Sequence, residues 1–191
     1  MIILISGNSC TGKTLLSQRL LEKYKIPYLS VDHLKMGLYR GINNIGFTPL
    51  DSDERIGEKL WPILKGVIMT NIENSQSLII EGCYILPHHI QSIAKSYSDH
   101  IISVFLGFST NYILNNFESN IIAHRNAIET RQYSEGRTVE DLIREHDELR
   151  KKCLEHSVNY FEINEDYSAE IMNVYEFIET KKQWIKISQN S

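Results

Sequence analysis

The chain has 191 residues, of which 42% are hydrophobic and 23% charged, a balance typical of a globular protein with one sizeable core and too short for two. Its 20 basic and 24 acidic residues give a formal net charge of −4, which provides no overall attraction to nucleic acid or to an anionic membrane. No apolar stretch approaches the roughly 18 residues that a membrane span requires.

The cysteines also limit where the protein is expected to work. Cys10, Cys83 and Cys153 are odd in number, widely spaced and free of any C-x-x-C pattern, which predicts free thiols in a reducing, cytoplasmic compartment. The first five residues are apolar, but no basic region precedes them, so they predict a strand rather than a signal peptide.

Short apolar runs alternate with amphipathic segments along the chain. This alternation predicts an α/β protein with a five-stranded parallel sheet and helices on both faces, whose ligands bind at the carboxyl ends of the strands. The predicted strands cover residues 1–5, 26–31, 77–82, 100–106 and 158–163, and the predicted helices cover 15–21, 32–40, 51–74, 87–98 and 169–187, with a polar, helix-favouring segment at 109–157.

A glycine-rich octet follows the first predicted strand and precedes the first predicted helix. It matches the pattern G-x-x-x-x-G-K-[ST] and occurs in the strand–loop–helix context that gives this pattern its meaning. Glycines allow successive backbone N–H groups to point into one concavity, and the start of the helix adds its positive dipole end. The octet therefore predicts a site for a nucleoside triphosphate. The residues expected to hold it are Gly7, Asn8, Ser9, Cys10, Thr11, Gly12, Lys13, Thr14 and Leu15.

Two groups are candidates for binding the metal that accompanies a triphosphate. The hydroxyl of Thr14 can bind Mg²⁺, and Lys13 can reach the β- and γ-phosphates. Glu81 ends the third predicted strand, so the sheet would hold its carboxylate at the same edge as the glycine loop, where it could bind Mg²⁺ directly or through water. A role in orienting the acceptor, or as an ordinary capping or surface glutamate, stays open for Glu81. His88 and His89 lack a second pair at zinc-ligand spacing, so no zinc site is predicted.

Asp32 and several arginines bear on the type of reaction. Asp32 follows the second predicted strand, where a carboxylate could take the proton of a hydroxyl acceptor during phosphoryl transfer or could simply cap the next helix. Arg125, Arg131 and Arg137 surround a segment with weak packing signals, residues 132–136, and guanidinium groups on a mobile flap would stabilise the transferring phosphoryl group. Lys35 and Arg40 could contact an anionic substrate.

The chain resembles the small P-loop kinases of the nucleoside-kinase-like group, and within it 2-phosphoglycerate kinase-like and adenylate kinase-like proteins. The resemblance rests on residues 7–14, 29–34 and 79–87, and more loosely on 124–150. It implies a P-loop NTPase fold in a single domain, residues 1–191, with an acceptor-side helical insert at about 33–75 and an arginine-bearing lid at about 122–140. Relatives that phosphorylate hydroxyl groups imply Asp32 as the base and the flap arginines as stabilisers.

Together these observations predict a cytoplasmic phosphotransferase that uses ATP and Mg²⁺ to phosphorylate a small molecule, with a hydroxyl acceptor such as 2-phosphoglycerate or a related metabolite. The predicted catalytic residues are Lys13, Asp32, Arg125 and Arg131, and the predicted metal ligands are Thr14 and Glu81. Two alternatives stay open at this stage: a nucleoside monophosphate kinase, and a noncatalytic ATP-dependent regulatory module. Neither a membrane nor a nucleic-acid partner is expected.

Overall fold

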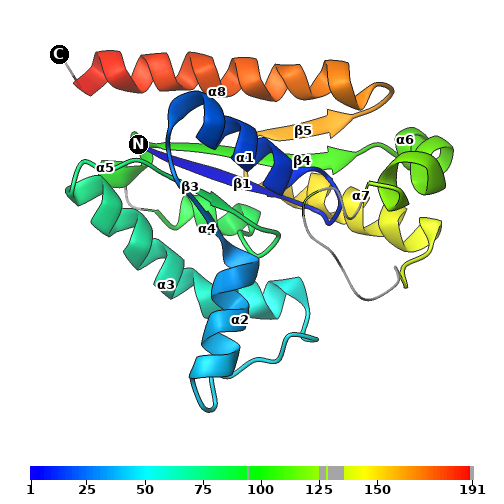
Figure 1. Cartoon of the computed structure of the whole chain (residues 1–191), viewed down its shortest axis with the longest axis horizontal. Helices are drawn as coiled ribbons and strands as arrows, with labels where there is room; N and C mark the ends of the chain where they lie inside the picture. Colours follow the sequence, from blue (N-terminus) through cyan, green and yellow to red (C-terminus); the bar gives the residue numbers. More distant parts are fainter. Residues whose placement is uncertain (94, 125–127, 129–135, 190–191) are drawn as a thin grey trace.

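The computed structural model describes residues 1–93, 95–124, 128 and 136–189. Within these residues, five parallel strands form one sheet in the order β2-β3-β1-β4-β5 (Figure 1). The strands are β1 (Ile2–Gly7), β2 (Tyr28–Ser30), β3 (Leu78–Glu81), β4 (Ile101–Phe108) and β5 (Tyr160–Ile163). The central position of β1 places the glycine loop that follows it in the middle of the carboxyl edge. The predicted α/β class and five-stranded parallel sheet are confirmed.

Helices cover both faces of the sheet, as predicted. The α1 and α8 helices pack on one face, whereas α3, α4 and α7 lie on the other. The helices are α1 (Lys13–Tyr24), α2 (Val31–Gly41), α3 (Asp53–Glu73), α4 (Pro87–Gln91), α5 (Lys95–Ser98), α6 (Thr110–Asn116), the π-helix η1 (Phe117–Ile122), α7 (Val139–Glu155) and α8 (Tyr167–Gln189).

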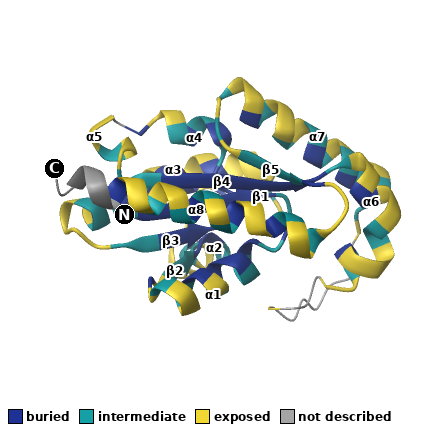
Figure 2. Cartoon of the chain, turned by 90° about the horizontal axis from the view of Figure 1, so that it is seen from above, coloured by how far each residue is buried: buried dark blue, intermediate teal, exposed yellow. Residues whose placement is uncertain are grey.

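The strand β1 is buried throughout and apolar from Ile2 to Ile5, because both of its faces are covered. Ile3 and Ile5 belong to the core beneath α1 and α8, while Ile2 and Leu4 belong to the core beneath α3. Successive side chains of a strand point to opposite faces, so one apolar run contributes to both cores. The burial colouring shows the same for β1 and β4, which are dark along most of their length (Figure 2). A rigid, fully buried strand thus supports the loop at its end.

Two predicted elements differ from the structure in ways that matter for the site. The second strand is only Tyr28–Ser30, not residues 26–31, because β2 is an edge strand that pairs with β3 alone and β3 ends opposite Ser30, at Glu81. The chain therefore turns into α2 at Val31, one residue before the predicted helix 32–40, and Asp32 lies in the first turn of this helix. The predicted helix 87–98 is two shorter helices, α4 and α5.

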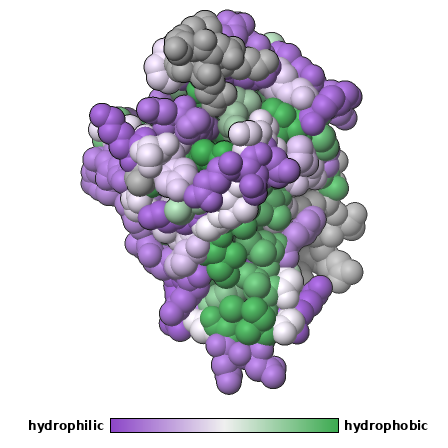
Figure 3. Space-filling view, turned by 90° about the vertical axis from the view of Figure 1, so that its left-hand side faces the viewer, coloured by the Kyte–Doolittle hydropathy of each residue, from purple (hydrophilic) through white to green (hydrophobic). Residues whose placement is uncertain are grey.

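Polar and apolar surface are unevenly distributed over the molecule. Apolar side chains gather over the lower half of the side along which α3 runs (Figure 3). Ile63 of α3 is 38% exposed, and Ile42, which directly follows α2, is 47% exposed. Even so, no helix in the described part of the chain has both the length and the apolar character needed to cross a membrane.

Candidate functional site: a phosphate loop beside a cavity

The loop between β1 and α1 has the backbone shape that its glycines predict. Gly7 has φ 138° and Gly12 has φ 83°, conformations that side chains disfavour. A Cβ on Gly7 would overlap the carbonyl of Leu106 on β4, and one on Gly12 would overlap the hydroxyl of Tyr167. Both glycines are therefore required by contacts with distant segments as well as by the turn itself.

Lys13 lies across this loop. Its Nζ donates a hydrogen bond to the backbone oxygen of Asn8 at 2.6 Å, and the Thr11 hydroxyl donates to the same oxygen at 2.8 Å. The Lys13 residue is only 9% exposed. An ammonium group held over a concave loop at the start of a helix is suited to bind phosphate oxygens.

Thr14 and Glu81 meet beneath the loop, although 67 residues separate them. The Thr14 hydroxyl donates to Glu81 Oε2 at 3.3 Å, because the parallel register sets Glu81 beside Ile5, two residues before the loop begins. Glu81 is only 2% exposed. Burial raises the pKa of this carboxyl group and the charge of Asp32 adds to the rise, while Lys13 opposes it. A buried carboxylate beside a hydroxyl fits the oxygen ligands that Mg²⁺ prefers.

A cavity of about 640 Å³ opens on the α8 side of the loop, within the size range of small-molecule sites. Phe108 and Tyr112 stack with their ring centroids 4.7 Å apart and form part of its wall. The Tyr167 hydroxyl donates to the backbone oxygen of Thr11 at 3.3 Å, which joins the start of α8 to the loop. The cavity therefore has phosphate-binding groups at one end and aromatic side chains at the other, an arrangement that suits a nucleotide. Its lining includes Cys10, Gly12, Lys13, Thr14, Leu15, Arg19, Phe108, Tyr112, Asn120, Asp166 and Tyr167.

A buried histidine supports the aromatic wall from behind. The backbone N–H of Phe108 donates to His146 Nδ1 at 2.8 Å, and the two rings stack at 5.3 Å. Burial lowers the pKa of His146 to about 3, with the charges of Lys13 and Arg137 contributing. The ring is therefore neutral at physiological pH and acts as a fixed hydrogen-bond acceptor for the end of β4.

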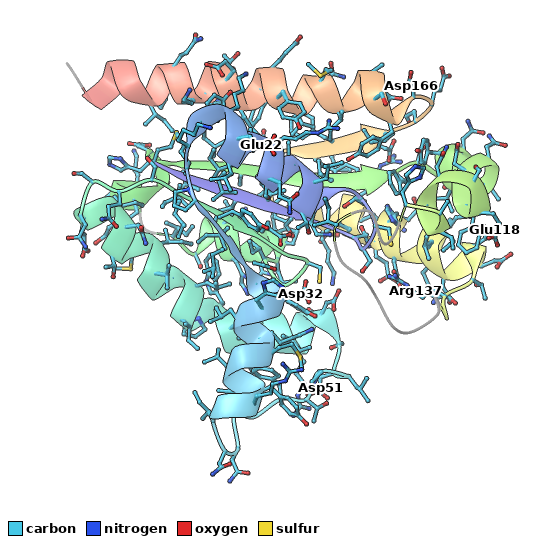
Figure 4. All side chains as sticks on the ribbon, in the orientation of Figure 1. Glu22, Asp32, Asp51, Glu118, Arg137 and Asp166 are labelled. Atoms are coloured by element: carbon cyan, nitrogen blue, oxygen red, sulfur yellow. The ribbon has the colours of Figure 1, made fainter. Side chains whose placement is uncertain are left out.

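Asp32 lies on the opposite side of the start of α1, away from Asp166 at the rim of the cavity (Figure 4). Its Oδ1 is 3.2 Å from Lys35 Nζ and accepts a hydrogen bond from the Tyr84 hydroxyl at 3.4 Å. Lys35 Nζ in turn donates to the Tyr84 hydroxyl at 2.5 Å. The side chain of Asp32 remains 46% exposed, so one face of the carboxylate is held by protein groups while the other is open to a ligand.

The predicted flap arginines Arg125 and Arg131 lie outside the described residues, as does most of the expected lid at about 122–140. In the described chain that follows, Arg137 Nη1 is 3.0 Å from Glu145 Oε2, and Thr138 caps α7 through Asp141.

A second group of titratable side chains occurs away from the loop. Ligand atoms of Glu58, His88 and His89 lie within 4.8 Å of one another. However, the Leu86 N–H donates to His89 Nδ1 at 3.1 Å, so the neutral ring carries its proton on Nε2 and has no free lone pair for a metal. His89 also stacks on Trp61 at 4.4 Å. We interpret this group as a structural cluster.

Sequence reasoning missed two residues of the candidate site. Tyr167 opens the last helix, and its hydroxyl contacts the loop at Thr11 and Gly12. Tyr84 lies within the segment 79–87 that carries the family resemblance, but nothing in the sequence links it to Lys35, 49 positions away. Long-range contacts define both.

Comparison with solved structures shows the same fold. The chain is similar to shikimate kinase from Bacteroides thetaiotaomicron, with 18% identity, a TM-score of 0.58 and coverage of 94% of this chain and 98% of that one. A gluconokinase from Sinorhizobium meliloti 1021 matches with 14% identity, a TM-score of 0.56 and coverage of 98% and 94%. A sugar kinase from Janibacter sp. HTCC2649 matches with 12% identity, a TM-score of 0.53 and coverage of 93% and 94%.

At these identities the likeness establishes the P-loop NTPase fold. No protein-family model matches the sequence, and no curated protein matches it.

Proposed function

We propose that the protein is an ATP- and Mg²⁺-dependent kinase that transfers the γ-phosphoryl group to a hydroxyl group of a small molecule. The observation that supports this most strongly is the half-open carboxylate of Asp32. One oxygen is held by Lys35 and Tyr84, the side chain is 46% exposed, and the phosphate loop with its Thr14–Glu81 pair lies next to it. The solved structures of similar fold include a shikimate kinase, a gluconokinase and a sugar kinase, which is consistent with this class of reaction.

We assign a role to each residue from its position around the phosphate loop. Lys13 and the loop amides hold the phosphates, and the wall formed by Phe108 and Tyr112 receives the base. Thr14 and Glu81 would hold Mg²⁺, which would supply positive charge to neutralise the phosphates. In this proposal α2 and α3, within the insert expected at about 33–75, would form the acceptor side.

In the transfer, the hydroxyl oxygen of the acceptor forms the new bond to the γ-phosphorus and the bond to the β-phosphate bridging oxygen breaks, which releases ADP. Asp32 accepts the hydroxyl proton as the new bond forms. Arg125 and Arg131, from the proposed lid at about 122–140, would stabilise the charge on the moving phosphoryl group.

An acceptor screen tests this proposal. Purified protein with Mg-ATP is incubated with a broad set of hydroxylated metabolites, 2-phosphoglycerate among them, and with each nucleoside monophosphate, and acceptor-dependent ADP release is measured. We expect release with a hydroxyl acceptor. Release with a nucleoside monophosphate alone would indicate the monophosphate kinase instead, and tight ATP binding without any acceptor-dependent release would indicate a noncatalytic module.

A further inference from the structure

A hollow of about 620 Å³ lies at the end of α2 that is farther from the phosphate loop. It is formed by the last turns of α2, the loop that joins α2 to α3, and the first turn of α3. This volume falls in the range of small-molecule sites. The residues assigned above to ATP, Mg²⁺ and catalysis lie elsewhere, so the hollow is a second cavity of the described chain.

The loop that forms the hollow is anchored to the core. Phe47 is only 5% exposed and packs in the core beneath α3. The backbone N–H of Thr48 donates to Asp51 Oδ2 at 3.0 Å, and Arg55 Nε lies 3.2 Å from the same oxygen. These contacts tie the loop to α3 and give the hollow a fixed shape, which lowers the cost of ordering it around a ligand.

The wall of the hollow combines apolar and polar surface. Tyr39 is 43% exposed and Ile42 is 47% exposed, while Asn43 and Asn44 present exposed amide groups. A sugar ring has the same two kinds of surface. Its C–H faces pack on an aromatic ring, and the hydroxyls at its edge exchange hydrogen bonds with planar amide groups. The hollow therefore matches the surface of a sugar ring.

The hollow lies along the same face of α2 as Asp32. Tyr39 follows Asp32 by seven residues, which is within about 20° of two full helical turns and corresponds to about 10 Å along the axis. Both side chains therefore leave α2 in nearly the same direction. Figure 4 shows Asp32 near the start of α2 and Asp51, which lines the hollow, beside the other end of the helix. One molecule with two linked rings can thus extend from the carboxylate to the hollow.

We infer that the acceptor is a disaccharide or longer saccharide, whose reacting hydroxyl lies at Asp32 and whose second ring binds in the hollow at Tyr39. This inference rests on the proposed kinase function and narrows its substrate class. Tyr39 and Ile42 supply the apolar contact for the second ring, and Asn43 and Asn44 bond to its hydroxyls. A single sugar at Asp32 would leave the hollow unfilled.

Matched acceptors that differ by one sugar unit test the inference. The pairs are glucose with maltose, glucose with cellobiose, galactose with lactose, and N-acetylglucosamine with diacetylchitobiose. Binding of each sugar to the Mg²⁺-bound protein with a nonhydrolysable ATP analogue is measured by calorimetry, and ADP release with Mg-ATP is measured in parallel. In at least one pair we expect the disaccharide to exceed the monosaccharide by about 10-fold or more in affinity and in kcat/KM, because the second ring adds apolar contact and hydrogen bonds.

Variants of the wall assign the preference to the hollow. Tyr39→Ala is expected to reduce the preference for the disaccharide to about 3-fold or less, whereas Tyr39→Phe keeps the ring and should retain it. Asn44 has φ 59°, so Asn44→Gly removes an amide without straining the backbone and should lower disaccharide affinity by about 3-fold. The control is Leu154→Ala, which truncates an apolar side chain of α7 that is 68% exposed and should leave the preference unchanged. A thermal melt of each variant establishes that it is folded.

The outcomes separate the two proposals. Equal or tighter binding of the monosaccharide in every pair, binding of no saccharide in the set, or an unchanged preference in folded Tyr39→Ala would overturn the inference. ADP release with acceptors other than saccharides alone would also overturn it, but would leave the kinase function standing. Binding in the expected order without any ADP release would instead support the second-ring site and contradict the kinase function.

Discussion

The two sides of the phosphate loop are built in different ways. The nucleotide side combines a contiguous octet with an aromatic wall, and the buried His146 ring behind that wall is neutral. The acceptor side combines charged and polar side chains from α2 and from the loop after β3, and Lys35 is already paired there. The comparison teaches that one contiguous segment supplies the backbone groups and the lysine for a polyphosphate, which every donor nucleotide shares, whereas selecting one acceptor requires side chains arranged by the tertiary fold.

Replacing Lys13 should cause the largest loss and should affect the donor side first. Lys13→Met removes the ammonium group that lies over the loop, so we expect acceptor-dependent ADP release to fall by about 10³-fold. The measurement is steady-state ADP release with saturating Mg-ATP. Lys151→Met, at an exposed lysine of α7, is the matched control and should keep full activity. Near-normal release from a folded Lys13→Met protein would contradict the assignment of the phosphate site.

Replacing Asp32 should lower the rate of phosphoryl transfer while leaving ATP binding nearly unchanged. Asp32→Asn keeps the shape of the side chain but removes its capacity to accept a proton, and we expect kcat to fall by about 10²–10⁴-fold. The affinity for an ATP analogue, measured by calorimetry, should change little. The control is Glu22→Gln, on the exposed surface of α1. An equal loss of ATP affinity would mean that Asp32 belongs to the nucleotide site.

These two residues also show how much could be predicted from the sequence. The octet around Lys13 was predictable because its spacing, the preceding apolar run and the following helix are all local. Asp32 was predicted at the start of the helix that follows the second strand, and it lies in the first turn of α2. The second strand itself was predicted too long, because the length of β2 depends on where its neighbour β3 ends. The link from Lys35 to Tyr84 and the contact of Tyr167 with the loop depend on packing between segments distant in sequence, which no local pattern encodes.

Glu81 bonds to Thr14 beside the phosphate loop and lies close enough to Asp32 for its charge to act on the Glu81 carboxyl group. Its replacement can therefore be tested through stability as well as activity. Burial raises its pKa above the usual value of 4.5. Below that value the carboxyl is protonated in both the folded and unfolded states, whereas near neutral pH the folded state must hold an ionised group that the unfolded chain exposes to water. Glu81→Gln should therefore increase the free energy of unfolding at neutral pH, and this gain should disappear as the pH falls toward 4.5.

The same variant should lose function while it gains stability. Without the carboxylate, the Mg²⁺ concentration needed for half-maximal ADP release should rise by about 10–100-fold. Chemical denaturation at several pH values without Mg²⁺, together with a Mg²⁺ titration of activity, measures both effects. A variant that is less stable at neutral pH than the parent would show that the Thr14 contact outweighs the burial of charge.

The smallest effect is expected from Tyr84→Phe, which alters only how Lys35 and Asp32 are held. The ring and its contact with Lys35 Nζ remain, but the hydroxyl that bonds to both Lys35 and Asp32 is lost. Because a hydrogen bond contributes about 0.5–1.5 kcal/mol net, kcat/KM for the acceptor should fall by about 3–10-fold while KM for ATP stays constant. The control is Tyr97→Phe, which removes a hydroxyl bonded to Glu73 on the surface. If Tyr84→Phe instead raised KM for ATP, Tyr84 would also contribute to nucleotide binding, and its assignment to the acceptor side alone would be wrong.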